Sequence, residues 1–268
     1  MSDYFDNIVK HISSPADVGL ILGSGLGGFA DTLENAQSVS TRDLPGYPQS
    51  TVAGHAGRIV IGNVGKTRVA AFQGRVHLYE GYSPPMVVTP VRVAHALGAK
   101  ILIVTNASGA FTRRFSPGDL LLIEDHINLQ FRNPLHALWE EGVRIQDTSF
   151  FYDPVLTTLA ERVALEERIP LKRGTLAGML GPTYETRAEA RMLAKLGADA
   201  GCMSTVPEAI MAVALGMRVL GISCVTNWAP NIGESTLDHD DVQQVAAQAG
   251  ERFARLLRAI LQRMKEEG

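Results

Sequence analysis

The sequence predicts an α/β fold in one domain spanning residues 1–268, built on a central mixed, partly parallel β-sheet flanked by helices. Short apolar runs typical of buried strands alternate with helical segments along the chain. Several of these runs lead directly into loops of glycine and small polar residues, as at the carboxyl ends of strands in α/β proteins. No internal repeat, low-complexity segment or linker divides the chain, and 268 residues suffice for one large α/β domain.

The composition is that of a protein with a sizeable core, because 46% of the residues are hydrophobic and 20% are charged. The net charge is −3 with both signs mixed along the chain, which argues against a nucleic-acid partner. No apolar run is long enough to span a bilayer and the first residues lack a signal core, so we expect no membrane association and a cytoplasmic location. Cys202 and Cys224 lie in apolar runs and are interpreted as buried free thiols.

The first half of the chain alternates helix and strand patterns. Amphipathic spacing predicts a short first helix, apolar runs predict buried strands, and a turn at Gly65-Lys66 joins two strands into a hairpin. Gly98 is placed to end the helix before the next strand, whose end is predicted to be a loop of small residues at 105–110. The elements expected here are helices at 3–13, 30–34 and 90–97 and strands at 17–22, 58–64, 68–72 and 100–104.

The second half contains an irregular segment, residues 130–153, that is rich in aromatic side chains. A loop this long inside one domain is usually functional, and its aromatics predict a subunit interface or an active-site wall. Asp153 is placed to cap the next helix. The C-terminal helix shows amphipathic spacing with a charged outer face. The elements expected here are strands at 119–123, 174–179 and 218–225 and helices at 154–167, 187–196, 208–215 and 240–264.

A glycine loop follows the first predicted strand. Gly23, Gly25 and Gly28 match the pattern GxGxxG, and a loop between strand and helix presents backbone N–H groups to an anion. Dinucleotide binding in an oxidoreductase is one interpretation, but the acidic residue expected about twenty positions on would be Asp43, which lies in a turn segment. A tight turn without a ligand is another interpretation.

A first group of residues at predicted strand ends and loops consists of hydrogen-bond donors and cations, which suit a phosphate dianion. This group comprises Ser24, His55, Arg75, Ser204 and the backbone N–H groups near Ala107. Arg75 belongs to a loop at 73–82 that carries arginine, histidine, tyrosine and glutamate directly after a strand, although a solvated loop is the alternative reading.

A second group offers one carboxylate acceptor, one amide that both donates and accepts, and apolar or aromatic faces. Such a set suits a flat heterocycle with N–H and C=O groups on its edge, and we interpret it as a purine site. This group comprises Tyr184, Glu185, Met203 and Asn227. A polar group between the two sets, such as a sugar, could be held by His77, Tyr79 and His239.

Eight segments stand in the order found in one known family: GSGLGG (23–28), GHAGR (54–58), QGRVHLYEGY (73–82), TNASGA (105–110), DHINL (125–129), GPTYET (181–186), MSTVPE (203–208) and TN (226–227). On these segments the chain resembles the trimeric purine nucleoside phosphorylases of the purine nucleoside phosphorylase and methylthioadenosine phosphorylase family, nearly end to end. Eight motifs in the right order are far more specific than any one of them.

The resemblance implies a nucleoside phosphorylase-like fold, a homotrimer, and a reaction in purine salvage: purine nucleoside and phosphate give free purine base and ribose 1-phosphate. It implies no metal and no organic cofactor, with inorganic phosphate as co-substrate. The implied phosphate-binding residues are Ser24, His55, Arg75, His77, Ser204 and the backbone of Ala107. The implied purine and ribose contacts are Tyr79, Tyr184, Glu185, Met203, Asn227 and His239. The residues implied in catalysis are His77, Glu185 and Asn227.

The resemblance also bears on base choice. The Asn227 amide can donate to a purine O6, whereas the adenine-preferring methylthioadenosine branch carries Asp at that point, so Asn227 predicts 6-oxopurines. Inosine, guanosine, xanthosine and the deoxy forms are all candidate substrates. Tyr184 stands where relatives have Phe and could favour the 2-oxo group of xanthosine. Gly201-Cys202 replaces a Val-Gly pair and could widen the site, and Trp228 stands where relatives often have Lys.

Several alternatives stay open on the sequence alone. A methylthioadenosine-type enzyme and a catalytically silent purine-binding protein are the rival functions, and a hexamer of trimers is the rival assembly. In the family a Phe from the neighbouring subunit covers the ribose, and Ile145 is the expected equivalent in the segment 130–153. The histidines show no metal-ligand spacing, so no metal site is expected.

Overall fold

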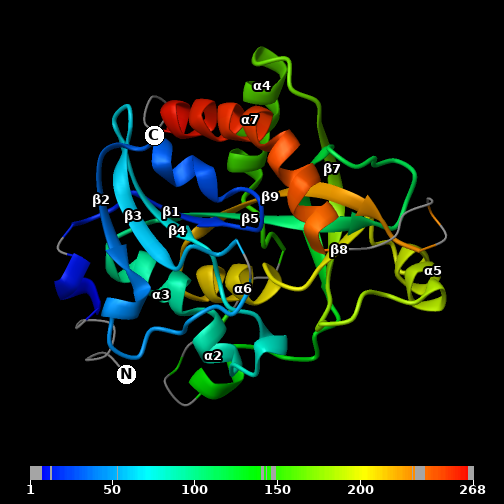
Figure 1. The fold of residues 1–268 in the computed structure, drawn as a ribbon, viewed down its shortest axis with the longest axis horizontal. Coiled ribbons are helices and arrows are strands. Elements are labelled where there is room, and N and C mark those ends of the chain that lie inside the picture. Colours follow the sequence, from blue (N-terminus) through cyan, green and yellow to red (C-terminus); the bar gives the residue numbers. More distant parts are fainter. Residues whose placement is uncertain are drawn as a thin grey trace.

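A mixed β-sheet runs through the molecule and sets the place of the other elements (Figure 1). The computed structural model describes residues 8–12, 14–52, 54–139, 142, 144–145, 149–230, 232 and 239–264. Within these residues the sheet has nine strands in the order β2-β3-β4-β1-β5-β8-β7-β6-β9. The strands are β1 (Val18–Leu22), β2 (Glu34–Ser40), β3 (Arg58–Val64), β4 (Thr67–Gln73), β5 (Ile101–Ala110), β6 (Leu120–Asn128), β7 (Leu171–Gly178), β8 (Ala200–Cys202) and β9 (Arg218–Trp228).

Strand β5 joins two parts of this sheet. It pairs with β1, β8 and β9. Because β8, β7, β6 and β9 are paired in that order and β9 pairs again with β5, these five strands close into a ring. Strands β1, β4, β3 and β2 extend from β5 as an open sheet. Strand β4 pairs in parallel with β1, β1 pairs in parallel with β5, and β5 pairs in parallel with β9. Their carboxyl ends therefore meet at one edge, where open α/β sheets place ligand sites.

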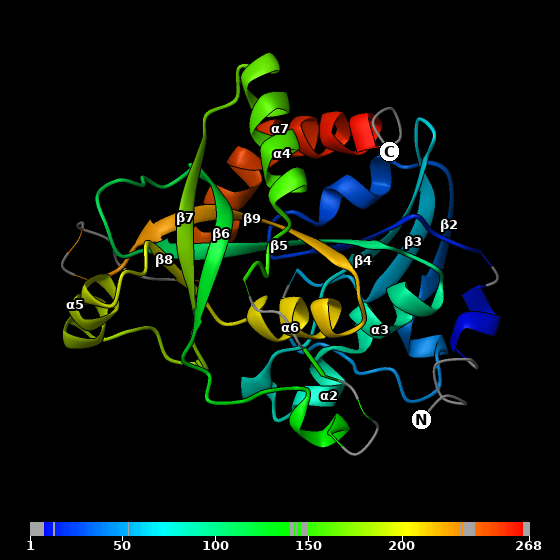
Figure 2. The ribbon, with the colours of Figure 1, turned by 180° about the vertical axis from the view of Figure 1, so that it is seen from behind.

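Helices cover the sheet from opposite sides. Helices α4 and α7 pack together and on β9 from one side, and α3 and α6 pack together from the other side (Figures 1 and 2). Each side encloses its own cluster of buried apolar side chains. The helices are α2 (Pro84–Val87), α3 (Thr89–Ala96), α4 (Pro154–Glu166), α5 (Arg187–Lys195), α6 (Val206–Ala214) and α7 (His239–Met264), with 3₁₀ helices η1 (Gly27–Thr32), η2 (Thr41–Asp43), η3 (Leu78–Glu80) and η4 (His136–Leu138).

The predicted α/β fold with a mixed sheet is confirmed, and most predicted elements occur within a few residues of their expected bounds. Residues 8–12 of the first predicted helix are helical, and the rest of that helix lies outside the described residues. Asp153 caps α4 as predicted, because its side chain accepts hydrogen bonds from the N–H groups of Val155 and Leu156.

Three predictions about local structure are wrong. The helix predicted at 30–34 is instead η1, and β2 follows it at the edge of the sheet; the exposed, polar sequence of this strand gives no alternating pattern. The loop predicted at 105–110 continues β5, because these small residues pair with β9. Strand β6 likewise extends to Asn128, since residues 125–128 pair with β7.

The topology excludes the dinucleotide-binding interpretation of the glycine loop. In that fold the strand after the loop and helix lies parallel beside the first strand and ends in the acidic residue. Here β1 pairs with β4 and β5, while β2 is antiparallel to β3, and Asp43 lies in η2. None of the helices among the described residues combines the length and the apolar character that a membrane span requires. Cys202 and Cys224 are buried free thiols, as predicted.

Candidate active site

One pocket gathers the residues that the sequence analysis singled out. It lies where β1, β4, β5, β8 and β9 end and encloses about 720 Å³, including its open mouth. The predicted site residues on its wall are Ser24, His55, Arg75, His77, Tyr79, Ala107, Tyr184, Glu185, Met203, Ser204 and Asn227. His239 is the first residue of α7, and its side chain lies outside the described residues. The pocket also brings in residues that the sequence analysis did not assign, namely Asn106, Ser108, Gly109, Thr226 and Val242.

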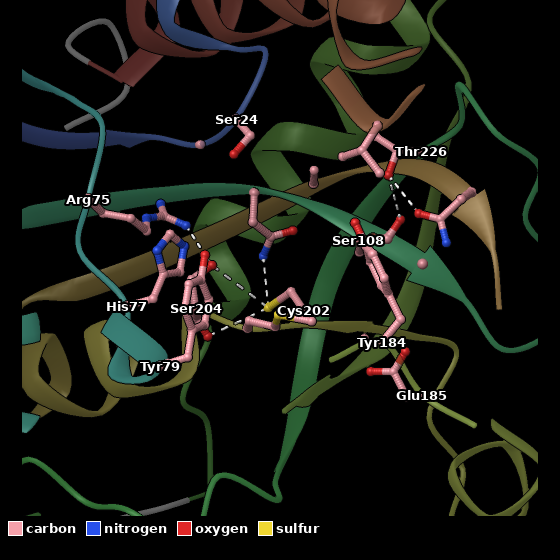
Figure 3. A pocket seen from close by; sticks show the side chains of 18 of the residues that line it. Ser24, Arg75, His77, Tyr79, Ser108, Tyr184, Glu185, Cys202, Ser204 and Thr226 are labelled. Atoms are coloured by element: carbon pink, nitrogen blue, oxygen red, sulfur yellow. Dashed lines mark hydrogen bonds between the residues drawn. The ribbon is translucent and has the colours of Figure 1, made fainter. Parts of the chain in front are cut away.

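Members of the two predicted groups lie toward different ends of this pocket. Figure 3 shows Arg75, His77 and Ser204 toward one end and Tyr184 and Glu185 toward the other. Arg75 and the donors around it are therefore separated from the Glu185 carboxylate within one cavity. A ligand that spans the pocket meets donors at one end and an acceptor at the other.

Arg75 is fixed on three sides by the protein. Its Nη1 donates to Ser204 Oγ at 2.8 Å, its Nη2 donates to the Thr105 carbonyl at 2.6 Å, and its Nε lies 3.1 Å from Glu208 Oε1. The side chains of both ion-pair partners are 1% exposed. Each terminal nitrogen of a guanidinium carries two N–H groups, so a second donor on each remains for an oxyanion.

Glu208 is the partner that the sequence analysis missed. It lies in the first turn of α6. The one feature of the sequence that could have indicated a buried role is that Glu208 is the acidic residue of an otherwise apolar helix. Burial raises the pKa of Glu208, while the charge of Arg75 and the nearby backbone N–H of Thr205 oppose that rise. A buried ion pair of this kind rigidifies the Arg75 side chain, and removing one partner leaves an uncompensated buried charge.

Two histidines and a tyrosine stack along the wall beside Arg75. The ring centroids are 5.6 Å apart for His55 and His77 and 4.7 Å apart for His77 and Tyr79. Burial, together with the charges of His77 and Arg75, lowers the pKa of His55 to about 4, so its ring is neutral at pH 7. We assign its Nδ1–H as donor to the Arg75 carbonyl at 2.7 Å, which leaves Nε2 to accept from the Ser24 hydroxyl at 3.3 Å.

Glu80 holds the His77 ring in place. Its Oε1 accepts from the His77 backbone N–H at 2.7 Å and lies 2.9 Å from His77 Nδ1, and its Oε2 accepts from the backbone and the hydroxyl of Thr51. Burial alone would raise the pKa of Glu80, but these hydrogen bonds lower it to about 2. Glu80 therefore stays ionised at neutral pH and orients His77. In the sequence, Glu80 is one member of the polar loop at 73–82, and no role was predicted for it.

At the other end, the Asn227 amide is oriented by its neighbours. Its Oδ1 accepts from the Thr226 hydroxyl at 3.0 Å and its Nδ2 donates to the Trp228 carbonyl at 3.3 Å. A Cβ at Gly109 would lie 2.8 Å from Asn227 Nδ2, so only glycine at that position leaves room for the amide. With its oxygen engaged by Thr226, the amide presents its nitrogen as a donor.

Glu185 and Met203 complete the ligand-facing wall. Burial raises the pKa of Glu185, and the charge of Glu189 raises it further. Met203 packs beneath Gly181, whose φ is +70°, and a Cβ at Gly181 would overlap the Met203 sulfur and lie 3.1 Å from the Tyr79 ring. The glycine of the GPTYET segment is therefore needed for the close approach of Met203 and Tyr79.

A buried polar network supports the floor of the pocket. Asn106 Nδ2 donates to Thr205 Oγ1 at 2.7 Å, and the Ser223 hydroxyl donates to Ser108 Oγ at 2.7 Å and contacts Asn106 Oδ1. Thr205 is fully buried with φ at +61°, a strained conformation for a threonine. These bonds hold the backbone that presents the neighbouring Ser204. Nothing in the local sequence indicated these partners, because they are about one hundred residues apart.

The structure accounts for two of the departures from the family pattern, at Gly201 and Trp228. A Cβ at Gly201 would lie 2.6 Å from the Phe111 ring, so Phe111 fills the space that the sequence analysis took for extra room. Trp228 does not line the pocket; its Nε1 donates to the Phe115 carbonyl at 2.8 Å.

Cys202 lines the pocket, and burial raises the pKa of its thiol. Ile145 is not on the wall of the pocket in its own chain.

Comparisons with known proteins show the family to which the chain belongs. The family model of the phosphorylase superfamily matches residues 17–262. Purine nucleoside phosphorylase 1 of Bacillus subtilis is 47% identical over 256 residues, which cover 95% of this chain and 94% of that protein. The chain belongs to the phosphorylase superfamily, in the purine nucleoside phosphorylase family.

Solved structures show the same fold in this family. A Schistosoma purine nucleoside phosphorylase in complex with hypoxanthine superposes with a TM-score of 0.90 at 34% identity, covering 96% of each chain. The Schistosoma mansoni purine nucleoside phosphorylase in complex with adenosine gives the same TM-score, identity and coverage. Among the described residues of our chain, no group of three or more His, Cys, Asp or Glu could hold a metal ion.

Proposed function

We propose that this chain is a purine nucleoside phosphorylase that converts 6-oxopurine nucleosides and phosphate into free base and ribose 1-phosphate or its deoxy form. The observation that carries the proposal is one pocket with Arg75 at one end and Glu185 at the other, also lined by Asn227, which accepts a hydrogen bond from Thr226. A phosphate oxygen forms a bond to C1′ while the C1′–N9 bond breaks and its electron pair moves into the purine. The proton that hydrogen phosphate gives up ends on the released base.

In this proposal the phosphate lies at the Arg75 end. The second N–H groups on Nη1 and Nη2 bind two of its oxygens, with Ser24, His55, His77, Ser204 and the backbone of Ala107 around them. Because Glu208 and Ser204 hold the guanidinium, it does not have to reorganise when the anion enters. The bound dianion also lies near the positive charge that develops on the sugar, which stabilises the transition state.

The purine lies at the other end in this proposal. Glu185 accepts from the N1–H of a 6-oxopurine, Tyr184 stacks on the ring, and the Asn227 nitrogen donates toward N7 and O6. Since negative charge grows on the purine as the glycosidic bond breaks, a donor at N7 is worth more in the transition state than in the substrate. Tyr79, Met203 and His239 would contact the ribose between the two ends.

We also propose that the enzyme works as a homotrimer in the cytoplasm. Exposed aromatic side chains of the segment 130–153 support self-association, since Phe131, Trp139 and Phe150 are 61% to 80% exposed. Two buried free thiols suit a reducing compartment. The proposed reaction requires neither a metal nor an organic cofactor.

The test is base release from inosine, guanosine, xanthosine and adenosine, each with and without phosphate. We expect phosphate-dependent release from the 6-oxopurine nucleosides, with adenosine near background. Release without phosphate would identify a hydrolase instead. No release from any of the four would favour a purine-binding protein, and release from methylthioadenosine alone would favour the methylthioadenosine branch.

Base choice gives a specific prediction at Asn227. Its amide nitrogen donates to O6, whereas the exocyclic amino group of adenine needs an acceptor. Asn227→Asp is therefore expected to raise the ratio of kcat/KM for adenosine to that for inosine by about tenfold or more, a change of about 1.4 kcal/mol in relative transition-state binding. An unchanged ratio would contradict the contact between Asn227 and O6.

A further inference from the structure

The wall of the pocket divides where β7 and β8 stop pairing. The ladder between these strands ends with Gly178 opposite Cys202, followed by one more hydrogen bond from the Met179 N–H to the Cys202 carbonyl at 2.7 Å. Beyond this point the two segments separate. One continues through Met179 to the loop that carries Tyr184 and Glu185, and the other continues through Met203 to Ser204.

Gln130 bridges the two segments where they separate. Its Nε2 donates one hydrogen bond to the Met179 carbonyl at 3.1 Å and another to the Met203 carbonyl at 3.3 Å. Both N–H groups of the amide are therefore used, one on each segment. The residue is 2% exposed, so water does not replace these bonds in the folded chain.

Gln130 is itself held in position by the strand before it. Its backbone N–H donates to Asn128 Oδ1 at 3.1 Å, and the Leu129 N–H donates to the Gly178 carbonyl at 3.0 Å, which continues the pairing of β6 with β7. A Cβ at Gly178 would lie 3.7 Å from Gln130 Cδ, so the amide packs directly over this glycine. The bridge is thus built on three neighbouring strand ends.

We propose that Gln130 is a positioning residue that sets the separation between the purine-binding loop at 181–186 and the sugar-facing Met203. This proposal rests on the function proposed above. Gln130 does not line the pocket, so it acts through the two carbonyl groups rather than on the ligand. Because the bridge joins the purine and sugar sides, its loss affects nucleoside binding. Arg75 and Ser204 keep their own hydrogen bond at the phosphate end.

The test is Gln130→Met, which keeps the side-chain volume and removes both donors. The substitution leaves the Met179 and Met203 carbonyl groups without this donor. We expect the KM for inosine to rise about tenfold, while the KM for phosphate and kcat change by less than about twofold. An unchanged KM for inosine, or an equal rise in both KM values, would overturn the proposal.

A matched control separates positioning from stability. Thr67 is 1% exposed and donates from its hydroxyl to the Leu261 carbonyl at 2.7 Å, at the end of β4 remote from the pocket. Thr67→Val removes a buried hydrogen bond to a carbonyl and should lower the Tm without changing either KM. If Gln130→Met does not fold, Asn128→Ala removes the anchor of the Gln130 backbone instead, and a smaller rise in the KM for inosine is expected. No rise in that variant would count against the proposal.

Failure of the proposed function can be distinguished from failure of this inference. If the wild-type chain shows no phosphorolysis, the proposed function is wrong, and Gln130 is then judged by calorimetric binding of hypoxanthine and phosphate. The positioning role is supported if Gln130→Met raises the Kd for hypoxanthine about tenfold and leaves the Kd for phosphate unchanged. Equal hypoxanthine affinity in both proteins would overturn it.

Discussion

At the residue scale, three side chains of the proposed site each have a partner that sets their charge or direction. Arg75 is oriented by Glu208, His77 by Glu80, and the Asn227 amide by Thr226. Such partners hold donors and acceptors in the geometry that the ligand needs before it arrives. Preorganisation of this kind lowers the cost of charge development in the transition state.

Glu185 carries a prediction about pH. Burial raises the pKa of its carboxyl group above the usual 4.5, and an ionised carboxylate is needed to accept from the purine N1–H. As the pH falls through the raised pKa, Glu185 takes up a proton and the KM for inosine should rise, beginning above pH 4.5. Glu185→Gln should raise that KM about tenfold to a hundredfold at pH 7, the cost of a hydrogen bond to a charged group.

The measurement for Glu185 is the pH profile of kcat/KM for inosine in both proteins. Glu185→Gln should lack the acidic limb, because an amide does not titrate in this range. Glu189→Gln should keep the acidic limb but shift it to lower pH, since Glu189 lies outside the pocket in the capping box of α5 and its charge contributes to the raised pKa of Glu185. Persistence of the same acidic limb in Glu185→Gln would assign it to another group.

At the element scale, short local patterns decided where most helices and strands begin and end. Helix α4 is the clearest case, because Asp153 caps it and also forms an ion pair with Arg218 of β9 at 2.7 Å. The hydrogen bond from Arg218 lowers the pKa of Asp153, and the backbone donors Val155 and Leu156 lower it further. Partial burial acts in the opposite direction but does not cancel this effect. This one residue both starts the helix and ties it to the sheet.

Removal of that cap should destabilise the fold without affecting the proposed chemistry. Asp153→Ala is expected to lower the free energy of unfolding by about 1–2 kcal/mol, the usual cost of losing an N-cap. Asp153→Asn keeps the cap and loses only the charge, so its loss should be smaller. Urea denaturation measures both changes, and the KM for inosine should stay the same. Equal destabilisation in the two variants would place the effect in the ion pair instead.

Strands show where local patterns are insufficient. Strand β2 was missed because its residues are polar and exposed, so nothing in its own sequence distinguishes it from a loop. This segment forms a strand because its backbone pairs with the antiparallel strand β3. In the same way the small residues 105–110 look like a loop but extend β5, since β9 pairs with them on one side and β8 pairs with the last two.

At the scale of the whole molecule, the proposed trimer makes a prediction about mass and activity. Three chains of 28.9 kDa give about 87 kDa, which sedimentation equilibrium or light scattering can measure. Trp139→Ser combined with Phe150→Ser should shift the mass toward the monomer, because both side chains are exposed aromatics of the segment 130–153. Activity should fall with the mass if a neighbouring subunit covers the site.

Leu165 offers a control for that experiment. It is 80% exposed on α4, away from the aromatic segment, and Leu165→Ser should leave the mass unchanged. A wild-type chain that sediments as a monomer at micromolar concentration would contradict the proposed assembly. A trimer unaffected by the double substitution would place the interface on another surface.

The sequence alone determined the fold class, most element positions and eleven of the nineteen described residues of the pocket wall. Buried strands, caps and polar strand ends are set by patterns within a few residues, and the ordered motifs indicated one family. Only the tertiary structure decided which residues support the wall. Arg75 and Glu208 are more than one hundred residues apart, and Gln130 contacts Met179 and Met203 across separate strands. Such contacts depend on the pairing order of the sheet, which brings distant segments to one edge. Patterns among neighbouring residues do not indicate that order.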